Sequence, residues 1–279
     1  MGTQKRISFQ GELGAYGHQA CAEMFPDWTA VPCPSFDDAI KAVHDGRADR
    51  TMLPVENSTY GRVADIHTLL PESGLFIVGE HFVRVHANLL APEGTKLEDV
   101  REAMSHVVLL GQVRSFLEKH QITPIVGRDT AGCVKDVAER NEKGLAALGS
   151  ELAGEIYGLN VLARHVEDNS HNTTRFLVCS PQPEDPTGDR IMTSFLFRVR
   201  NLPAALYKAL GGFATNGVNM VKLESYMVEG SFTATQFYAD IEGHPDDIGV
   251  KRALEELDYF TSYLKILGSY PADDFRKTN

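Results

Sequence analysis

The chain has 279 residues, of which 43% are hydrophobic and 23% charged, and its formal net charge is −11. This is the composition of a globular protein, and the length predicts two domains. The excess of negative charge argues against binding to nucleic acid or to an anionic membrane, and no apolar run approaches the ~18 residues of a membrane span. An anionic substrate would therefore need positive charge gathered locally in a cleft.

The cysteines and histidines show no pattern of a redox or metal site. The four cysteines, Cys21, Cys33, Cys133 and Cys179, are widely spaced and form no CxxC pair. The ten histidines show no HExxH or HxxxH spacing. The N-terminus has no apolar core of a signal peptide. We therefore expect a cytoplasmic protein with reduced thiols and no metal.

Short apolar runs alternate with amphipathic helical patterns over the first 180 residues. The apolar runs predict strands at 6–10, 51–55, 75–91, 122–127 and 175–179. The amphipathic patterns predict helices at 18–25, 35–46, 63–70, 113–120, 130–141 and 150–158. This alternation predicts an α/β fold with mostly parallel sheets, in two lobes around a cleft.

The C-terminal part has a different pattern. Residues 179–190, CSPQPEDPTGDR, contain three prolines and no apolar periodicity, which is typical of a linker. A ferredoxin-like βαββαβ order follows, with elements predicted at 191–200, 202–217, 218–227, 231–243, 245–259 and 260–270. We expect a main domain at 5–180 with two α/β subdomains, a linker at 181–190 and a small domain at 191–271.

The first stretch that could carry chemistry is GELGAYGHQA at 11–20. Gly11, Gly14 and Gly17 lie between a strand and a helix, where backbone N–H groups can face an anion. The spacing GxxGxxG differs from the GxGxxG of dinucleotide sites, so it predicts no NAD. A glycine-rich turn without a ligand is equally consistent with the pattern.

The second stretch is PVENSTYG at 54–61. Glu56, Asn57 and Ser58 follow a strand, and ligands bind at the carboxyl ends of strands in open α/β sheets. Turn formation and helix capping favour the same residue types and remain an alternative.

The third stretch is SHVVLLGQ at 105–112, which leads into a helix and contains Ser105, His106 and Gln112. Ser105 is equally consistent with a plain N-cap, and His106 with a surface residue. The chain has no GxSxG elbow and no P-loop lysine.

The fourth stretch is DNSHNTTRFLV at 168–178. Asn172, Thr173 and Thr174 precede Arg175 and Phe176 at the start of a strand. A guanidinium fork grips a carboxylate with two parallel hydrogen bonds, which lysine cannot do. A partly exposed arginine at a strand start is the structural alternative.

Together, in this order, these stretches resemble the prephenate dehydratase family. PVENSTYGRV is similar to its P-[IV]-E-N-S-x-x-G-x-V segment, SHVVLLGQ to its S-H-x-x-x-L-x-Q pattern, and NTTRF to its N-x-T-R-F signature. The C-terminal βαββαβ part resembles an ACT domain, and the resemblance covers roughly residues 5–271. It implies a two-lobed catalytic domain like that of periplasmic binding proteins, followed by a regulatory domain.

The resemblance implies that the protein converts prephenate to phenylpyruvate, with loss of water and CO2, in L-phenylalanine biosynthesis and without a cofactor. The implied catalytic residues are Thr174, Arg175, Ser58, Asn57 and Glu56. The implied substrate-binding residues are Gly11, Gly14, Gly17, Asn172, Thr173, Phe176, Ser105, His106 and Gln112. The family often has Pro-Gln after Ser-His, where this chain has Val107 and Val108.

Aromatisation drives this reaction, so the protein mainly has to orient the substrate and help hydroxide leave as water. We expect the Thr174 hydroxyl to donate to the leaving oxygen, with Ser58 and Asn57 orienting it. A tight clamp on the ring carboxylate would stabilise the ground state, because that group leaves as neutral CO2. The hypothesis is therefore that Arg175 holds the pyruvyl carboxylate, while the ring carboxylate faces Phe176.

The resemblance also implies feedback by L-phenylalanine, and we expect a homodimer or homotetramer. The implied regulatory residues are Ala204, Ala205, Leu206, Asn219, Glu224 and Ser225. Two segments differ from the family pattern. Ala204 stands in place of the glycine of G-A-L, and Tyr226 and Met227 stand in place of the Arg-Pro of E-S-R-P.

Three alternatives remain. Arogenate carries an amino group where prephenate has a keto group, and an acidic residue near that end of the site would favour it. A small-anion binding protein without catalysis suits the two-lobed architecture, but it would have no need of a hydroxyl beside the arginine. An amino-acid sensor built on the C-terminal domain would leave residues 5–178 unexplained.

Overall fold

The computed structural model describes residues 4–200, 202–227 and 234–277. The chain divides into two compact units, one with residues 1–66 and 81–176 and the other with residues 67–80 and 177–279. All four cysteines are buried free thiols. In the described ranges, no helix is both long and apolar enough to cross a bilayer.

The first lobe is built on a sheet with strand order β2-β1-β3-β11-β5. These strands are β1 Arg6–Gln10, β2 Thr29–Cys33, β3 Arg50–Asn57, β5 Phe76–Arg84 and β11 Thr173–Ser180, and the short β4 Gly61–Arg62 pairs with β3. The helices along this part of the chain are α1 Tyr16–Met24, α2 Phe36–His44 and α3 Ala64–Leu69, with the 3-10 turn η1 Leu70–Glu72. Because β1 is parallel to both β2 and β3, their carboxyl ends lie at one edge of the sheet.

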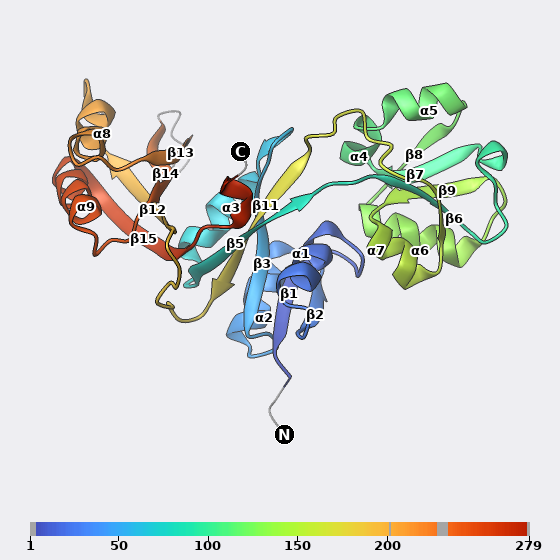
Figure 1. The fold of residues 1–279 in the computed structure, drawn as a ribbon, viewed down its shortest axis with the longest axis horizontal. Coiled ribbons are helices and arrows are strands. Elements are labelled where there is room, and N and C mark those ends of the chain that lie inside the picture. Colours follow the sequence, from blue (N-terminus) through green and yellow to red (C-terminus); the bar gives the residue numbers. More distant parts are fainter. Residues whose placement is uncertain (1–3, 201, 228–233, 278–279) are drawn as a thin grey trace. The chain divides into compact units, whose positions relative to one another are not determined.

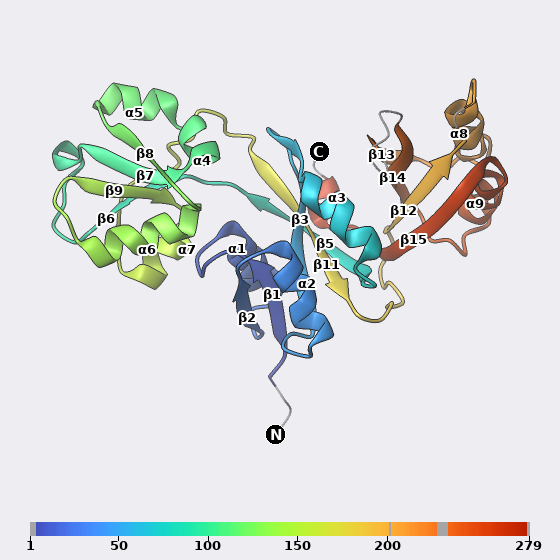
Figure 2. The same ribbon diagram turned by 180° about the vertical axis from the view of Figure 1, so that it is seen from behind.

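The second lobe is a three-layered α/β/α structure. Its strand order is β10-β6-β9-β7-β8, with β6 Asn88–Ala91, β7 Glu102–His106, β8 Thr123–Gly127, β9 Leu145–Gly149 and β10 Asn160–Ala163. The helices are α4 Val107–Gly111, α5 Arg114–His120, α6 Thr130–Arg140 and α7 Glu151–Tyr157, with the 3-10 turn η2 Leu97–Asp99. Figures 1 and 2 show α4 and α5 on one face of this sheet and α6 and α7 on the other.

Side-chain alternation builds the two cores of this lobe. Leu89 and Leu148 belong to the core that also contains Leu110 of α4 and Leu117 of α5. Their sequence neighbours Leu90 and Ala147 belong to the core that contains Val134 and Val137 of α6. Both faces of the sheet are therefore covered, and its central strand β9, LAALG, is apolar and buried at every position.

Two expectations about the strands were wrong. Residues 75–91 do not form one strand, because residues 85–87 cross from the first sheet to the second and separate β5 from β6. The sheets are mixed rather than mostly parallel, since β6 is antiparallel to both β9 and β10. Apolar periodicity cannot show in which sheet a strand pairs, so neither feature was visible in the sequence.

The C-terminal part confirms the predicted βαββαβ order. A four-stranded antiparallel sheet, β13-β14-β12-β15, is made of β12 Ile191–Val199, β13 Met220–Met227, β14 Ala234–Glu242 and β15 Thr261–Pro271. The helices α8 Ala205–Thr215 and α9 Ile248–Phe260 pack on one face over Phe195, Phe197 and Phe237. The predicted strand 231–243 begins with residues 231–233, which lie outside the described ranges.

The opposite face of this sheet carries a buried polar cluster. Ser194 donates to Asp240 (2.5 Å), accepts from Tyr238 (3.1 Å) and contacts the hydroxyl of Tyr270 (2.6 Å). The ring of His67, from the segment 67–80, packs edge-on against Tyr238. This contact is one of those that join residues 67–80 to the C-terminal unit.

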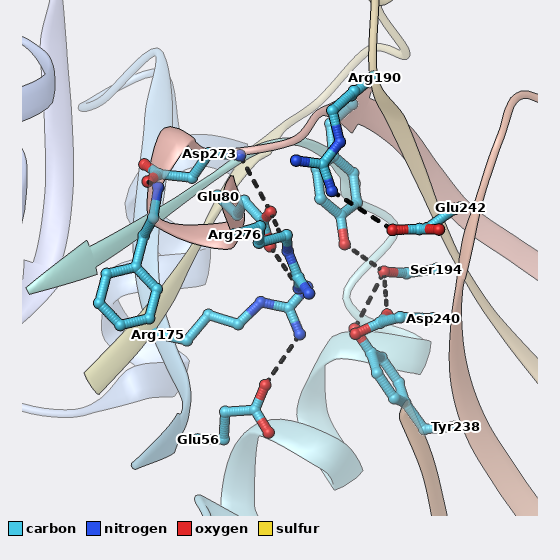
Figure 3. Close-up of polar contacts among 12 residues, drawn as sticks. Glu56, Glu80, Arg175, Arg190, Ser194, Tyr238, Asp240, Glu242, Asp273 and Arg276 are labelled. Carbon is cyan, nitrogen blue, oxygen red and sulfur yellow. Dashed lines mark hydrogen bonds and ion pairs between the residues drawn. The ribbon is translucent and has the colours of Figure 1, made fainter. Parts of the chain in front are cut away.

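A buried ion pair fastens the C-terminal end of the chain to β5. The guanidinium of Arg276, in the 3-10 turn η3 Asp274–Lys277, grips Glu80 through Nε (2.6 Å) and Nη2 (2.9 Å), as Figure 3 shows. The Asp273 N–H also donates to Glu80 (3.2 Å). The Glu80 side chain is fully buried, so its charge depends on these donors.

We predict that Arg276→Ala lowers the free energy of unfolding by about 3 kcal/mol, because it removes a two-bond charge partner of a buried carboxylate. Lys277→Ala is the matched control: its ammonium pairs with Asp274 at the exposed surface, so the loss should stay below about 0.5 kcal/mol. Urea unfolding of the two variants measures the difference. Equal losses would show that the Glu80 pair contributes no more than a surface pair.

Candidate active site

The alternation of side chains along β11 decides which residues of NTTRF face a pocket. Thr174 and Phe176 line a pocket of 330 Å³ within the first unit. Thr173 and Arg175, one position away in each case, lie on the other face of the strand, where both are buried. A hydroxyl and an aromatic ring are thus presented to the pocket, and the guanidinium is not.

The Arg175 side chain is buried and forms an ion pair inside the protein. It is 1% exposed, and Nη1 lies 2.9 Å from Glu56 Oε1 (Figure 3). Among the described residues that line the pocket, neither Arg175 nor Glu56 appears. The arrangement therefore does not support the expectation that Arg175 grips a substrate carboxylate, and it gives Glu56 the role of a counter-charge.

Asn57 holds Thr174 in a defined orientation. Its Oδ1 accepts from the N–H groups of Thr59 (2.9 Å) and Tyr60 (3.0 Å). Its Nδ2 donates to Thr174 Oγ1 (2.9 Å) and to Asn172 Oδ1 (2.7 Å). These four bonds use the full capacity of the amide, and the two backbone donors fix which end is oxygen.

The orientation of Asn57 determines where the Thr174 proton can go. Because the Thr174 oxygen accepts from Asn57, its own hydrogen must point elsewhere. No acceptor for that hydrogen occurs among the described residues. The hydroxyl can therefore donate to a molecule in the pocket.

Other residues of the NTTRF and ENS stretches form hydrogen bonds that hold Asn57 and Thr174 in place. Asn172 Nδ2 donates to Gln112 Oε1 (2.8 Å), which extends the chain of amides into the second lobe. Ser58 accepts from the Thr173 N–H (2.9 Å), donates to the His171 carbonyl (2.8 Å), and its own N–H reaches the Thr173 carbonyl (2.9 Å). Ser58 therefore links the end of β3 to the start of β11 by hydrogen bonds.

The three glycines of the first stretch lie in different environments. Gly11 and Gly17 line the pocket. Gly14 has φ +89°, and a Cβ there would come within 2.6 Å of Ala153 in the second lobe. The Gly14 carbonyl accepts from the Ser150 hydroxyl (2.5 Å). Gly14 is therefore needed for the close approach of the lobes.

Of the three residues predicted in the third stretch, His106 is the one that lines the pocket. Ser105 is fully buried and donates to the Leu148 carbonyl (2.9 Å), so it holds β7 against β9. His106 caps α4, and its Nδ1 accepts weakly from the Val108 N–H (3.4 Å).

Several pocket residues were not predicted from the sequence. Tyr16 begins α1, Arg128 and Asp129 precede α6, and Thr130 is the first residue of α6. Arg128 follows β8 directly, so the rule that ligands bind at the carboxyl ends of strands, applied to Ser58, would also have found it. The Arg128 side chain is 86% exposed and makes long contacts, to Glu12 (3.9 Å) and Asp129 (3.4 Å).

The pocket has a positive electrostatic character despite the acidic chain. The N-termini of α1 and α6 both line it, and a helix N-terminus carries about half a positive charge. The N-cap of α1, Ala15, makes no side-chain cap hydrogen bond, so its side chain does not occupy the first N–H groups of this helix. Burial, followed by the charge of Glu167, raises the pKa of Tyr16 far above its usual range, so its hydroxyl stays protonated.

The residues implied in regulation lie in the C-terminal part. Ala204, Ala205 and Leu206 stand at the start of α8, and Ala204 keeps a left-handed backbone with φ +61°. Glu224 and Ser225 lie in the edge strand β13, and Asn219 precedes it and donates to Glu242 (3.1 Å).

Comparison with known proteins identifies relatives of this chain. The sequence profile of the prephenate dehydratase family matches residues 7–184. A bifunctional N-acyl-homoserine lactone acylase/prephenate dehydratase from Komagataeibacter europaeus is 52% identical over 279 residues, which cover 99% of each chain.

More distant relatives also match over nearly the whole chain. An arogenate dehydratase/prephenate dehydratase from Arabidopsis thaliana is 37% identical, over 98% of this chain and 74% of the plant protein. A prephenate dehydratase from Arthrobacter aurescens, solved in complex with L-Phe, has a TM-score of 0.87 and 29% identity, covering 96% of this chain and 90% of that one. The chain therefore belongs to the prephenate dehydratase family.

Proposed function

We propose that this protein converts prephenate to phenylpyruvate, water and CO2. The observation that carries the proposal is the Thr174 hydroxyl, which Asn57 orients so that its hydrogen can be given to a molecule in the pocket. A leaving hydroxide needs such a donor.

The reaction needs one proton and no electron acceptor. The ring carboxylate leaves as CO2, the pair of electrons from that bond enters the ring, and the ring C–O bond breaks. The departing hydroxide takes up a proton and leaves as water. The Thr174 hydroxyl stabilises the departing oxygen by a hydrogen bond, and its own oxygen is polarised by the Asn57 amide.

The pocket offers separate places for the two carboxylates. Arg128 and the N-termini of α1 and α6 suit the pyruvyl carboxylate, which keeps its charge throughout. The ring carboxylate would then lie against Met52 and Phe176, which also line the pocket. An apolar surrounding destabilises that charge and favours its loss as CO2.

The same pocket supports prephenate rather than arogenate as substrate. An ammonium group would require a free carboxylate, and Asp129 is the acidic residue among the described lining residues. Its Oδ1 caps the Gly132 N–H (2.7 Å) and its Oδ2 faces Arg128 Nε (3.4 Å), so both oxygens are engaged. Incubation of the purified protein with each substrate tests the proposal, with phenylpyruvate or phenylalanine as the product measured. Absence of phenylpyruvate from prephenate would refute it.

A second activity, hydrolysis of N-acyl-homoserine lactones, is proposed from the relative that is 52% identical. A groove of 630 Å³ in the second lobe is lined by Val107, Leu110 and Val126, and Val107 follows His106 of the substrate pocket. Val107 and Val126 are more than half exposed, so the groove offers apolar surface to an acyl chain. Release of homoserine lactone from the N-acyl compound measures this activity.

We also propose that L-phenylalanine binds the C-terminal ACT domain and lowers activity, in a homodimer or homotetramer. The relative from Arthrobacter aurescens was solved with L-Phe, and Ala204 keeps the left-handed backbone that a glycine would adopt. Titration calorimetry with L-phenylalanine tests binding, and light scattering gives the oligomeric state. No heat on titration would contradict the regulatory proposal.

We predict that Asn57→Asp lowers kcat by about 100-fold with the fold intact, because the effect of one positioned donor is about 10²–10⁴ in rate. The introduced carboxylate still accepts from Thr59 and Tyr60, but it cannot donate to Thr174, whose proton then turns toward that carboxylate. Asn169→Asp is the matched control: Asn169 only accepts, from the His171 N–H, and an aspartate can do the same. A kcat near the parent value for Asn57→Asp would remove this orientation from the mechanism.

For Arg128→Gln we predict a change mainly in KM rather than in kcat. The substitution should raise KM for prephenate by about 10-fold or more while kcat falls little, since a charge-assisted hydrogen bond is worth about 1.5–3 kcal/mol. Arg140→Gln, at the exposed opposite end of α6, should leave KM unchanged. Steady-state kinetics of both variants make the comparison, and equal KM values would show that Arg128 does not bind substrate.

The pH dependence separates Thr174 from His106 as the donor. A histidine acid would make kcat fall as pH rises through the imidazole range, near pH 6.5. Donation by Thr174 should leave kcat constant between about pH 6 and 9, because the threonine hydroxyl does not titrate there.

A further inference from the structure

Two segments of the chain cross between the lobes of the first unit, and they lie side by side. Residues 84–88 lead from β5 to β6, and residues 163–173 lead from β10 to β11. Backbone hydrogen bonds of 2.9 Å join them, from Val166 N to the Ala87 carbonyl and from Val85 N to the Asn172 carbonyl. Any change in the angle between the lobes must bend these two segments, which form the hinge.

Glu167 ties the second hinge segment to the first. Its side chain is 5% exposed, its Oε1 lies 2.9 Å from His86 Nδ1, and its Oε2 accepts from the Ala87 N–H (2.9 Å). Burial works to raise the pKa of Glu167, but the hydrogen bonds from His86 and the backbone outweigh it and hold the pKa below its usual value. Glu167 is therefore a buried, ionised carboxylate that holds the two hinge segments together through His86 and Ala87.

This contact continues to the pocket through one further bond. The His86 carbonyl accepts a hydrogen bond of 2.8 Å from the Tyr16 hydroxyl. Tyr16 is the first residue of α1 and lines the pocket, next to the N–H groups that we assign to the substrate carboxylate. A path of direct contacts thus leads from Glu167 through His86 to Tyr16.

A second imidazole stacks on this path. The rings of His86 and His165 are parallel within 10°, with centroids 3.9 Å apart. His165 has φ +51°, and its N–H donates to Asn88 Oδ1 (3.4 Å). The other titratable groups facing the pair are Glu167 and Tyr16, described above, and Glu151 of α7, which interacts electrostatically with His165 while it pairs with Arg164.

We propose that Glu167 is a positioning residue for the substrate pocket, acting through His86 and Tyr16, and that protonation of both stacked imidazoles releases its hold in acid. Two imidazolium rings at this distance repel each other, and Glu167, the carboxylate in contact with His86, compensates one of them. The inference rests on the proposed function in that prephenate is the molecule positioned.

The first test compares Glu167→Gln with the parent. The glutamine can still accept from Ala87 and contact His86, so the fold should persist, but the charge is lost. We expect KM for prephenate at pH 7.5 to rise about 10-fold, the loss of a charge-assisted hydrogen bond, with kcat changed less than about twofold. Glu155→Gln, which removes an exposed carboxylate from α7, should leave both constants unchanged. A KM for Glu167→Gln within twofold of the parent would overturn the proposal.

The second test follows pH. For the parent, KM should rise by about fivefold or more between pH 7.5 and 5.5, where imidazoles take up protons. In His165→Asn the substituted side chain does not titrate, and asparagine accepts a positive φ, so KM should stay flat over this range. A rise in KM that persists in His165→Asn would place the acid sensitivity elsewhere and overturn this part.

A separate readout distinguishes the hinge from the enzymatic function. If the parent shows no turnover, the proposed function fails, and the hinge contact is then tested by NMR of the imidazoles. Loss of the carboxylate in Glu167→Gln should move the ring signals of His86, because Glu167 Oε1 lies 2.9 Å from His86 Nδ1. Unchanged His86 signals would overturn the assigned contact.

Discussion

The alternation of side chains along β11 is the constraint on which the site depends. In a strand, neighbouring residues point to opposite faces, so Thr174 and Arg175 cannot both reach one pocket. The structure places Thr174 with Phe176 in the pocket and gives Arg175 to Glu56 on the other face. Asn57 then fixes the direction of the Thr174 hydroxyl, because each of its own polar atoms already has a partner. Thr174 thus presents a hydroxyl of fixed orientation to the pocket, on the strand that also carries the buried Arg175 of the Arg175–Glu56 ion pair.

The distribution of charge fits a reaction in which one carboxylate must be kept and the other lost. A chain with net charge −11 attracts a dianion only where positive potential is concentrated. Two helix N-termini and Arg128 provide that concentration at one side of the pocket, and Met52 and Phe176 provide an apolar wall. In the reaction that we propose, binding energy would be directed to the carboxylate that survives, and the departing one would be left unstabilised.

Much of this was predictable from the sequence, and what was missed has physical causes. The strand at 6–10, the helix after the glycine turn and the βαββαβ order follow from apolar periodicity, and the structure contains all of them. The crossing at residues 85–87 and the strand β9, LAALG, were missed because pairing between distant segments leaves no local pattern. The motifs located Thr174 and Asn57, but the face that Arg175 occupies depends on tertiary packing. Arg128 was missed although it directly follows a predicted strand, and the Glu167–His86 contact comes from segments that lack a recognisable motif.

A crystal structure with an unreactive prephenate analogue would show which residues contact each group of the substrate. We predict a ring hydroxyl oxygen within hydrogen-bond distance of Thr174 Oγ1, the pyruvyl carboxylate at Arg128 and the helix N-termini, and Arg175 still paired with Glu56. A substrate carboxylate on the Arg175 guanidinium, with Glu56 displaced, would contradict this prediction.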